Sequence, residues 1–90
     1  MKTAAKKAAL RRLRIAAGQM RGLIAMVEGE QYCIDVITQS SAVKEALSAA
    51  ERIILEGHLT THVAEQMRSG KKKKAVDEIV KVYRLAQKKK

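Results

Sequence analysis

A long stretch of regularly spaced apolar residues, 31–68, which like the whole chain has no proline, is the feature that most limits how this 90-residue chain can fold. The stretch contains a single glycine, Gly57. Its apolar residues recur every three or four positions, the spacing of a helix with one apolar stripe. The stripe comprises Val36, Ile37, Val43, Leu47, Ala50, Ile54, Leu55 and Leu59. We therefore predict one helix over residues 31–69, far longer than the usual length of about 11–12 residues.

The only cysteine and both histidines of the chain, Cys33, His58 and His62, lie in this stretch. At about 100° per residue they fall within roughly 40° of one another, on the apolar face. Along the axis, however, Cys33 and His58 are separated by nearly 40 Å at about 1.5 Å per residue. One straight helix cannot bring them to one metal ion. Two antiparallel copies can, with a two-fold axis near Ala46 and Leu47 and one site at each end.

These three residues alone leave two interpretations equally supported. A thiolate with imidazoles suits Cu(I) or Zn(II) and, with further ligands, Ni(II) or Co(II). A cysteine on an apolar face is also often a small hydrophobic residue, and a histidine near a helix C-terminus can complement the helix dipole. The metal site is therefore one of two hypotheses at this point.

The charge distribution points to a polyanionic partner. The chain has 19 basic and 9 acidic residues, a net charge of +10. Residues 1–27 contain basic residues and no acidic one, and residues 71–90 are again strongly basic. Such basic ends favour nucleic-acid binding. No apolar run approaches 18 residues, so we expect no membrane span, and the single cysteine is compatible with a cytoplasmic location.

The whole pattern predicts a single all-α domain, residues 1–90. We expect three helices, at about residues 4–28, 31–69 and 75–87, and a basic tail at 88–90. Gly29 is expected to end the first helix as its C′ residue, and Gly70 to end the second. Gly18 and Gly22 favour close helix–helix approach, with access for a phosphate backbone as the alternative.

Several segments closely resemble the CsoR/RcnR family of bacterial metal-sensing transcriptional repressors. They are Arg11 to Gly22, Tyr32 to Gln39, Ser41 to Val43, Ala46-Leu47 and Glu56 to Leu59. The resemblance implies a three-helix protomer, an antiparallel helical-bundle homodimer, and a disc-shaped homotetramer formed as a dimer of dimers. It also implies an operator in double-stranded DNA, upstream of a metal-efflux gene.

The resemblance assigns a role to five residues. Cys33 matches the family's ligand cysteine, and His58 matches a ligand histidine supplied by the other protomer. His62 takes the third ligand position, which is cysteine in typical copper sensors and histidine in nickel/cobalt sensors. Tyr32 and Glu78 match residues that surround the site in copper sensors. The N-terminal histidine of nickel/cobalt members is missing, so Cu(I) is favoured over Ni(II), Co(II) or Zn(II).

The resemblance also implies DNA contacts by Arg14, Arg21 and Lys44, which the basic residues Arg11 and Lys7 of the first helix extend. We expect a repressor that binds its operator without metal and releases it on binding Cu(I). The alternatives are a Ni(II)/Co(II)-responsive repressor and a metal-independent architectural DNA-binding protein. An enzyme with Cys33 as nucleophile is not indicated, because no oxyanion-hole motif is recognisable.

Overall fold

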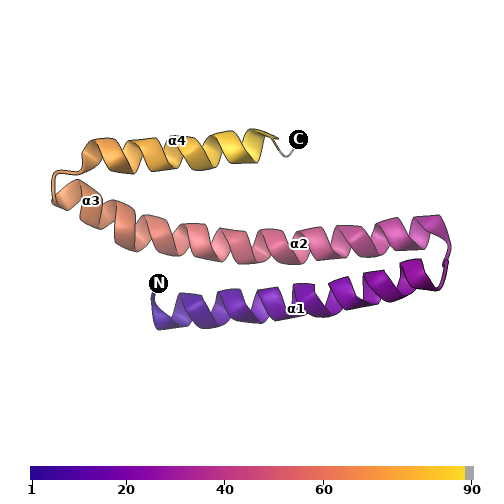
Figure 1. The fold of residues 1–90 in the computed structure, drawn as a ribbon. Helices are drawn as coiled ribbons and strands as arrows, with labels where there is room; N and C mark the ends of the chain where they lie inside the picture. Colours follow the sequence, from indigo (N-terminus) through magenta and orange to yellow (C-terminus); the bar gives the residue numbers. More distant parts are fainter. Residues whose placement is uncertain (89–90) are drawn as a thin grey trace. The chain divides into compact units, whose positions relative to one another are not determined.

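The computed structural model describes residues 1–88 and is α-helical throughout this range. The elements are α1 (Thr3–Glu28), α2 (Cys33–His58), the π-helix η1 (Leu59–Val63), α3 (Ala64–Arg68) and α4 (Lys72–Lys88) (Figure 1). The predicted all-α class is confirmed. None of the described helices combines the length and the apolar character that crossing a membrane requires.

The chain divides into two compact units, Met1–Gly57 and His58–Lys90. In the first unit, α1 and α2 form an antiparallel hairpin (Figure 1). The side chain of Gln39 donates a hydrogen bond from Nε2 to the backbone oxygen of Gln19, 3.1 Å away. Gly22 lies beside the same amide, because a Cβ there would stand 3.5 Å from Gln39 Nε2. The two helices therefore approach each other at Gly22, but at an ordinary van der Waals distance that an alanine would also allow.

Gly18 has no such role in the hairpin. The nearest atom to a Cβ built at Gly18 is the guanidinium of Arg21, a residue of the same helix, at 3.6 Å. Close helix packing consequently requires glycine at neither position. The alternative given for the pair, access to an approaching phosphate, remains a prediction for Gly18.

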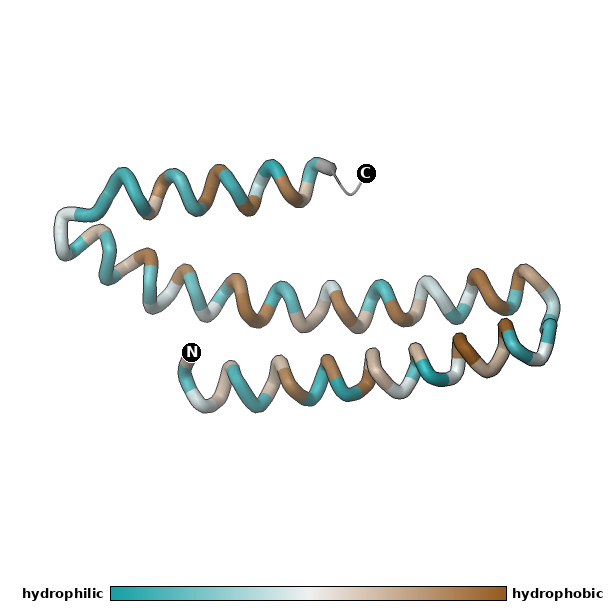
Figure 2. Tube along the Cα trace, viewed as in Figure 1, coloured by the Kyte–Doolittle hydropathy of each residue, from teal (hydrophilic) through white to brown (hydrophobic). Residues whose placement is uncertain are grey.

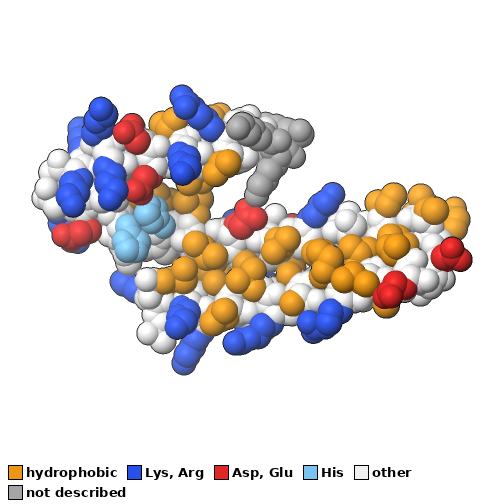
Figure 3. Space-filling model, in the orientation of Figure 1, with side chains coloured by type: hydrophobic (Ala, Val, Ile, Leu, Met, Phe, Trp, Pro, Cys, Tyr) orange, Lys and Arg blue, Asp and Glu red, His pale blue; other side chains and the backbone are white. Residues whose placement is uncertain are grey.

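The hairpin buries small side chains and leaves large ones exposed. Its buried residues are Ala9, Ala16, Val43 and Ala50. Apolar residues recur along both helices in Figure 2, and on the face drawn in Figure 3 they form a band over α1 and α2. The large exposed members of the hairpin include Leu13, Ile15, Met20, Ile24, Val27, Ile34, Ile37, Leu47 and Ile54. One chain therefore does not complete its own core.

The turn between α1 and α2 differs from the prediction. Gly29 is the C-cap, with φ −82°, and the left-handed residue that follows is Glu30, with φ 52°. The backbone N–H of Glu30 bonds to Val27 O and that of Gln31 to Met26 O, the pair of bonds of a Schellman motif. The prediction of Gly29 at C′ is thus wrong by one residue. Glu30 and Gln31 belong to the turn, and α2 begins only at Cys33.

The predicted uninterrupted helix over 31–69 is also wrong in detail. Regular α-helix ends at His58, five π-helical residues follow, and α-helix resumes at Ala64. In a π-helix the hydrogen bonds run from i to i+5, so an extra residue is fitted into a turn. No proline or glycine lies within Leu59–Val63 to mark this change in the sequence.

The second unit is a short helical hairpin. Ser69 caps α3, and Gly70 has φ 80°, which confirms the helix end predicted at Gly70. The third predicted helix, 75–87, extends in both directions to Lys72–Lys88, because lysine is a good helix former and nothing interrupts the run. The helix reaches Lys88, the last described residue, and the rest of the predicted tail lies outside the described residues.

Candidate metal centre and nucleic-acid interface

The two histidines lie side by side where the helix changes its hydrogen bonding. His58 is the last residue of α2, and His62 lies within η1. Their ring centroids are 5.2 Å apart and the rings are stacked, with an interplanar angle of 28° (Figure 3). π-Helical turns occur frequently at functional sites. This stacked pair is therefore a compact source of two imidazole ligands.

A carboxylate from α4 fixes one of the rings. His58 Nε2 and Glu78 Oε2 are 2.9 Å apart, and both side chains are about one third exposed. Glu78, predicted by resemblance alone to lie near the site, thus contacts a predicted ligand. Desolvation by itself would raise the pKa of Glu78. Hydrogen bonds from His58 and Gln66, together with the charges of His58 and Lys74, outweigh it and lower that pKa below its ordinary value of 4.5.

Gln66 is the residue of this network that sequence reasoning missed. Its Nε2 lies 3.4 Å from Glu78 Oε1. Gln66 lies on α3 and Glu78 on α4, so their contact depends on how the two helices pack. The sequence carries no local signal for such a pair.

The cysteine lies at the opposite end of α2 from His58. Cys33 is the first residue of α2, and its thiol is free and exposed. Tyr32 precedes it and is 71% exposed. A 26-residue helix separates its two ends by nearly 40 Å at about 1.5 Å per residue. Among the described residues of the single chain, no three His, Cys, Asp or Glu side chains are grouped so that they could hold a metal ion.

The predicted DNA-binding residues of α1 share one exposed face. Lys7, Arg11, Arg14 and Arg21 are all exposed, and at 100° per residue they span about 80° of the helix circumference. Gly18 falls within the same arc. In Figure 3, basic side chains line the α1 edge of the hairpin. We call these four residues the basic face of α1; Lys44 is likewise exposed, on α2.

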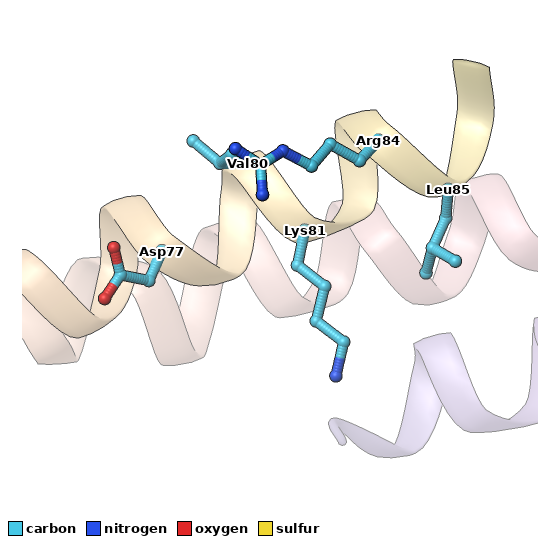
Figure 4. A pocket seen from close by; sticks show the side chains of 5 residues that line it. All are labelled: Asp77, Val80, Lys81, Arg84 and Leu85. Atoms are coloured by element: carbon cyan, nitrogen blue, oxygen red, sulfur yellow. The ribbon is translucent and has the colours of Figure 1, made fainter. Parts of the chain in front are cut away.

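A hollow along α4 was not predicted. Five side chains of that helix line it, as Figure 4 shows: Asp77, Val80, Lys81, Arg84 and Leu85. It contains one acidic group, two basic groups and two apolar side chains. None of the predicted metal ligands lines it, so this hollow is separate from the candidate metal centre.

Comparison with known proteins decides the family. The model of the metal-sensitive transcriptional repressor family matches residues 5–84. The chain belongs to this family. Its members are transcriptional repressors rather than enzymes, and the family predicted from the sequence motifs is confirmed.

Named relatives within the family are copper sensors. The copper-sensing transcriptional repressor CsoR of Mycobacterium ulcerans is 41% identical over 75 residues, covering 83% of this chain and 64% of the relative. CsoR of Bacillus subtilis is 37% identical over 73 residues, covering 81% and 72%. The chain thus spans just under two thirds of the mycobacterial relatives' length.

A solved structure supports the same assignment. The chain matches the copper-sensing repressor CsoR with Cu(I) from Geobacillus thermodenitrificans at a TM-score of 0.88 and 31% identity. The match covers 97% of this chain and 91% of the solved one. The fold of the family is therefore present over nearly the whole of the chain.

Proposed function

We propose that this protein is a cytoplasmic, copper(I)-responsive transcriptional repressor. In its metal-free form it binds an operator in double-stranded DNA, and on binding Cu(I) it releases the operator and derepresses a metal-efflux gene. One observation carries the proposal: His58 and His62 stack together at one end of α2, while the free thiol of Cys33 stands exposed at the other. The relatives named as copper-sensing repressors support the choice of metal and activity.

An antiparallel dimer would unite these groups. If Cys33 of one chain lies beside His58 and His62 of its partner, facing residue numbers sum to about 93, and Leu47 lies next to the two-fold axis. Leu47 and Ile54 share the helical face of Cys33 and His58, and they are 39% and 37% exposed. Covering this apolar face supplies the burial that a single small chain lacks. Two such dimers would form the homotetramer.

The donor set fits copper(I). A thiolate with two imidazoles is a soft to borderline set, which suits Cu(I) better than a hard cation. Bound there, copper(I) would cross-link two chains through Cys33 of one and His58 and His62 of the other. Tyr32 would accompany Cys33 into the neighbourhood of the partner's histidines. Because His62 also suits Ni(II) or Co(II), those ions and Zn(II) are the alternatives that the experiment must separate.

The basic face of α1 supplies the DNA-binding surface. Its cations, multiplied by several chains, would neutralise phosphates and release counterions, so affinity should fall steeply with salt. Lys44 would extend this surface. Metal bridging between chains changes how the helices are held together, and DNA binding and metal binding then oppose each other. A hundredfold loss of operator affinity corresponds to about 2.7 kcal/mol, within the usual range of allosteric coupling.

The test measures operator binding by fluorescence anisotropy. It compares the metal-free protein with its Cu(I), Ni(II), Co(II) and Zn(II) forms. We expect Cu(I) to give the largest loss of affinity. A Cys33→Ala variant should bind the operator as the unchanged protein does and ignore Cu(I). Equal DNA affinity with and without every metal would refute the proposal and favour a metal-independent architectural role.

A further inference from the structure

The carboxylate of Glu78 has a separate hydrogen-bond partner on each oxygen. Oε2 lies 2.9 Å from His58 Nε2, and Oε1 accepts from Gln66 Nε2 at 3.4 Å. An ionised carboxylate only accepts hydrogen bonds, so the proton of this pair sits on His58 Nε2. With that nitrogen directed at Glu78, Nδ1 is the ring nitrogen that faces away from the carboxylate and can be offered to a metal ion.

The orientation of Gln66 is determined by Glu78. Turned the other way, the amide oxygen of Gln66 would face a carboxylate oxygen, which is repulsive. In the orientation found, Gln66 Oε1 is buried and has no hydrogen-bond partner among the described residues. A buried unpaired carbonyl oxygen is unfavourable, so the orientation of this amide needs a compensating contact. The hydrogen bond from Gln66 Nε2 to Glu78 Oε1 supplies that contact.

We propose that Gln66 is a positioning residue of the metal site: it holds the Glu78 carboxylate so that this carboxylate fixes the ring of His58 with Nδ1 free. The inference rests on the proposed function for its significance, since His58 is a ligand only if the metal site exists. Gln66 acts through Glu78 and makes no contact with the metal itself. It links α3 to α4 on the side of the histidine pair.

The experiment uses the full chain and a Gln66→Met variant, which is similar in size but has no donor. In metal-free protein labelled with ¹⁵N-histidine, NMR measures how fast the His58 Nε2 proton exchanges with water. We expect this exchange to accelerate about tenfold in the variant, because a less firmly held acceptor protects the proton less. Cu(I) affinity, measured against a competing chelator, should fall by about ten- to a hundredfold.

A double variant separates positioning from general stabilisation. If Gln66 acts through Glu78, then Gln66→Met combined with Glu78→Gln should have the Cu(I) affinity of Glu78→Gln alone. Summation of the two single effects would overturn the proposal, as would unchanged proton exchange in Gln66→Met. Gln87→Ala, which alters an exposed glutamine of α4, is the matched control and should change neither quantity.

A substitute variant and a metal-free measurement cover the cases in which Gln66→Met does not fold or Cu(I) does not bind. If Gln66→Met does not fold, Gln66→Asn retains an amide that is too short to reach Glu78 and should show the same two losses. If the unchanged protein does not bind Cu(I), the proposed function fails. The exchange measurement on metal-free protein still shows whether Gln66 positions His58.

Discussion

The two compact units of this chain differ in the side chains that they bury and in the contacts that they make. The α1–α2 hairpin has a core of alanines and one valine, and its large apolar side chains stay partly exposed. The second unit buries Val63 and Ala75, and in it His58 and Gln66 share one part-buried carboxylate, that of Glu78. The hairpin thus leaves apolar surface uncovered, which the proposed dimer would bury, and the second unit holds polar side chains against one another.

The candidate metal ligands are also divided between the two units. Cys33 belongs to the hairpin, whereas His58 and His62 belong to the second unit. Because Cys33 and His58 lie at opposite ends of α2, the proposed site takes its thiol and its imidazoles from different chains. Assembly and sensing are consequently one process in the proposed function, and variants of the two units should fail in different ways.

The largest effect is expected at the apolar face of the hairpin. Leu47→Glu would place two like charges next to each other at the two-fold axis of the proposed dimer. We expect this to cost about 3–5 kcal/mol of dimer stability, because an unpaired charge is buried there. Sedimentation equilibrium should show monomers at concentrations where the unchanged protein is assembled. Leu85→Glu, at a half-exposed leucine of α4, is the control and should leave assembly intact.

The helix-ending turns of the two units should respond in opposite directions. Gly70 has φ 80° and open space around a would-be Cβ, so Gly70→Ala should cost about 1–2 kcal/mol through backbone strain alone. Glu30 has φ 52°, so Glu30→Gly should relieve strain and stabilise the protein by up to about 1 kcal/mol. Urea denaturation measures both changes. Loss of stability in both variants would contradict the Schellman geometry of the first turn.

The two glycines of α1 provide a smaller and more specific comparison. Gly18→Ala and Gly22→Ala should each raise helix stability by about 0.5–1 kcal/mol, since neither new methyl group meets an atom closer than 3.5 Å. Only Gly18→Ala should weaken operator binding, by about fivefold or 1 kcal/mol, because Gly18 lies within the basic face of α1. Anisotropy titrations at fixed salt test this, and equal DNA affinity of the two variants would remove Gly18 from the interface.

The smallest effect concerns the pH dependence of the second unit. The pKa of Glu78 is lowered in the folded protein, so the ionised carboxylate stabilises the fold above its ordinary pKa of 4.5. This contribution disappears as the pH falls below 4.5 through the lower, folded-state pKa. The stability difference between the unchanged protein and Glu78→Gln should therefore shrink between about pH 6 and about pH 3. A constant difference would show that the ionised form is not favoured.

Much of the fold could be predicted because periodicity and helix-ending glycines act locally. The first helix, the helical character around Cys33–His58 and the stop at Gly70 follow from such signals. The π-helical segment could not be predicted, because a shift from i+4 to i+5 hydrogen bonding leaves no mark in residue types. Glu30 was missed for a related reason: glycine is the usual left-handed residue, and here a glutamate one position later adopts that conformation.

The candidate site was predictable only in part. The spacing of His58 and His62 suggested neighbouring rings, and they do stack, with the π-turn between them. Glu78 came from family resemblance, because its partner lies 20 positions away in the sequence. The role inferred for Gln66 depends on the packing of α3 against α4, which sequence patterns do not specify. That Cys33 and the two histidines bind one metal ion together remains a prediction.

The central claim is that each metal site takes its thiol from one chain and its imidazoles from another. It is tested by refolding together a Cys33→Ala chain and a His58→Ala/His62→Ala chain, neither of which should bind Cu(I) alone. In a symmetric antiparallel dimer, each mixed dimer regains one intact site, so random mixing should restore about one Cu(I) per four chains. No restored binding in mixtures shown to contain mixed dimers would contradict the account.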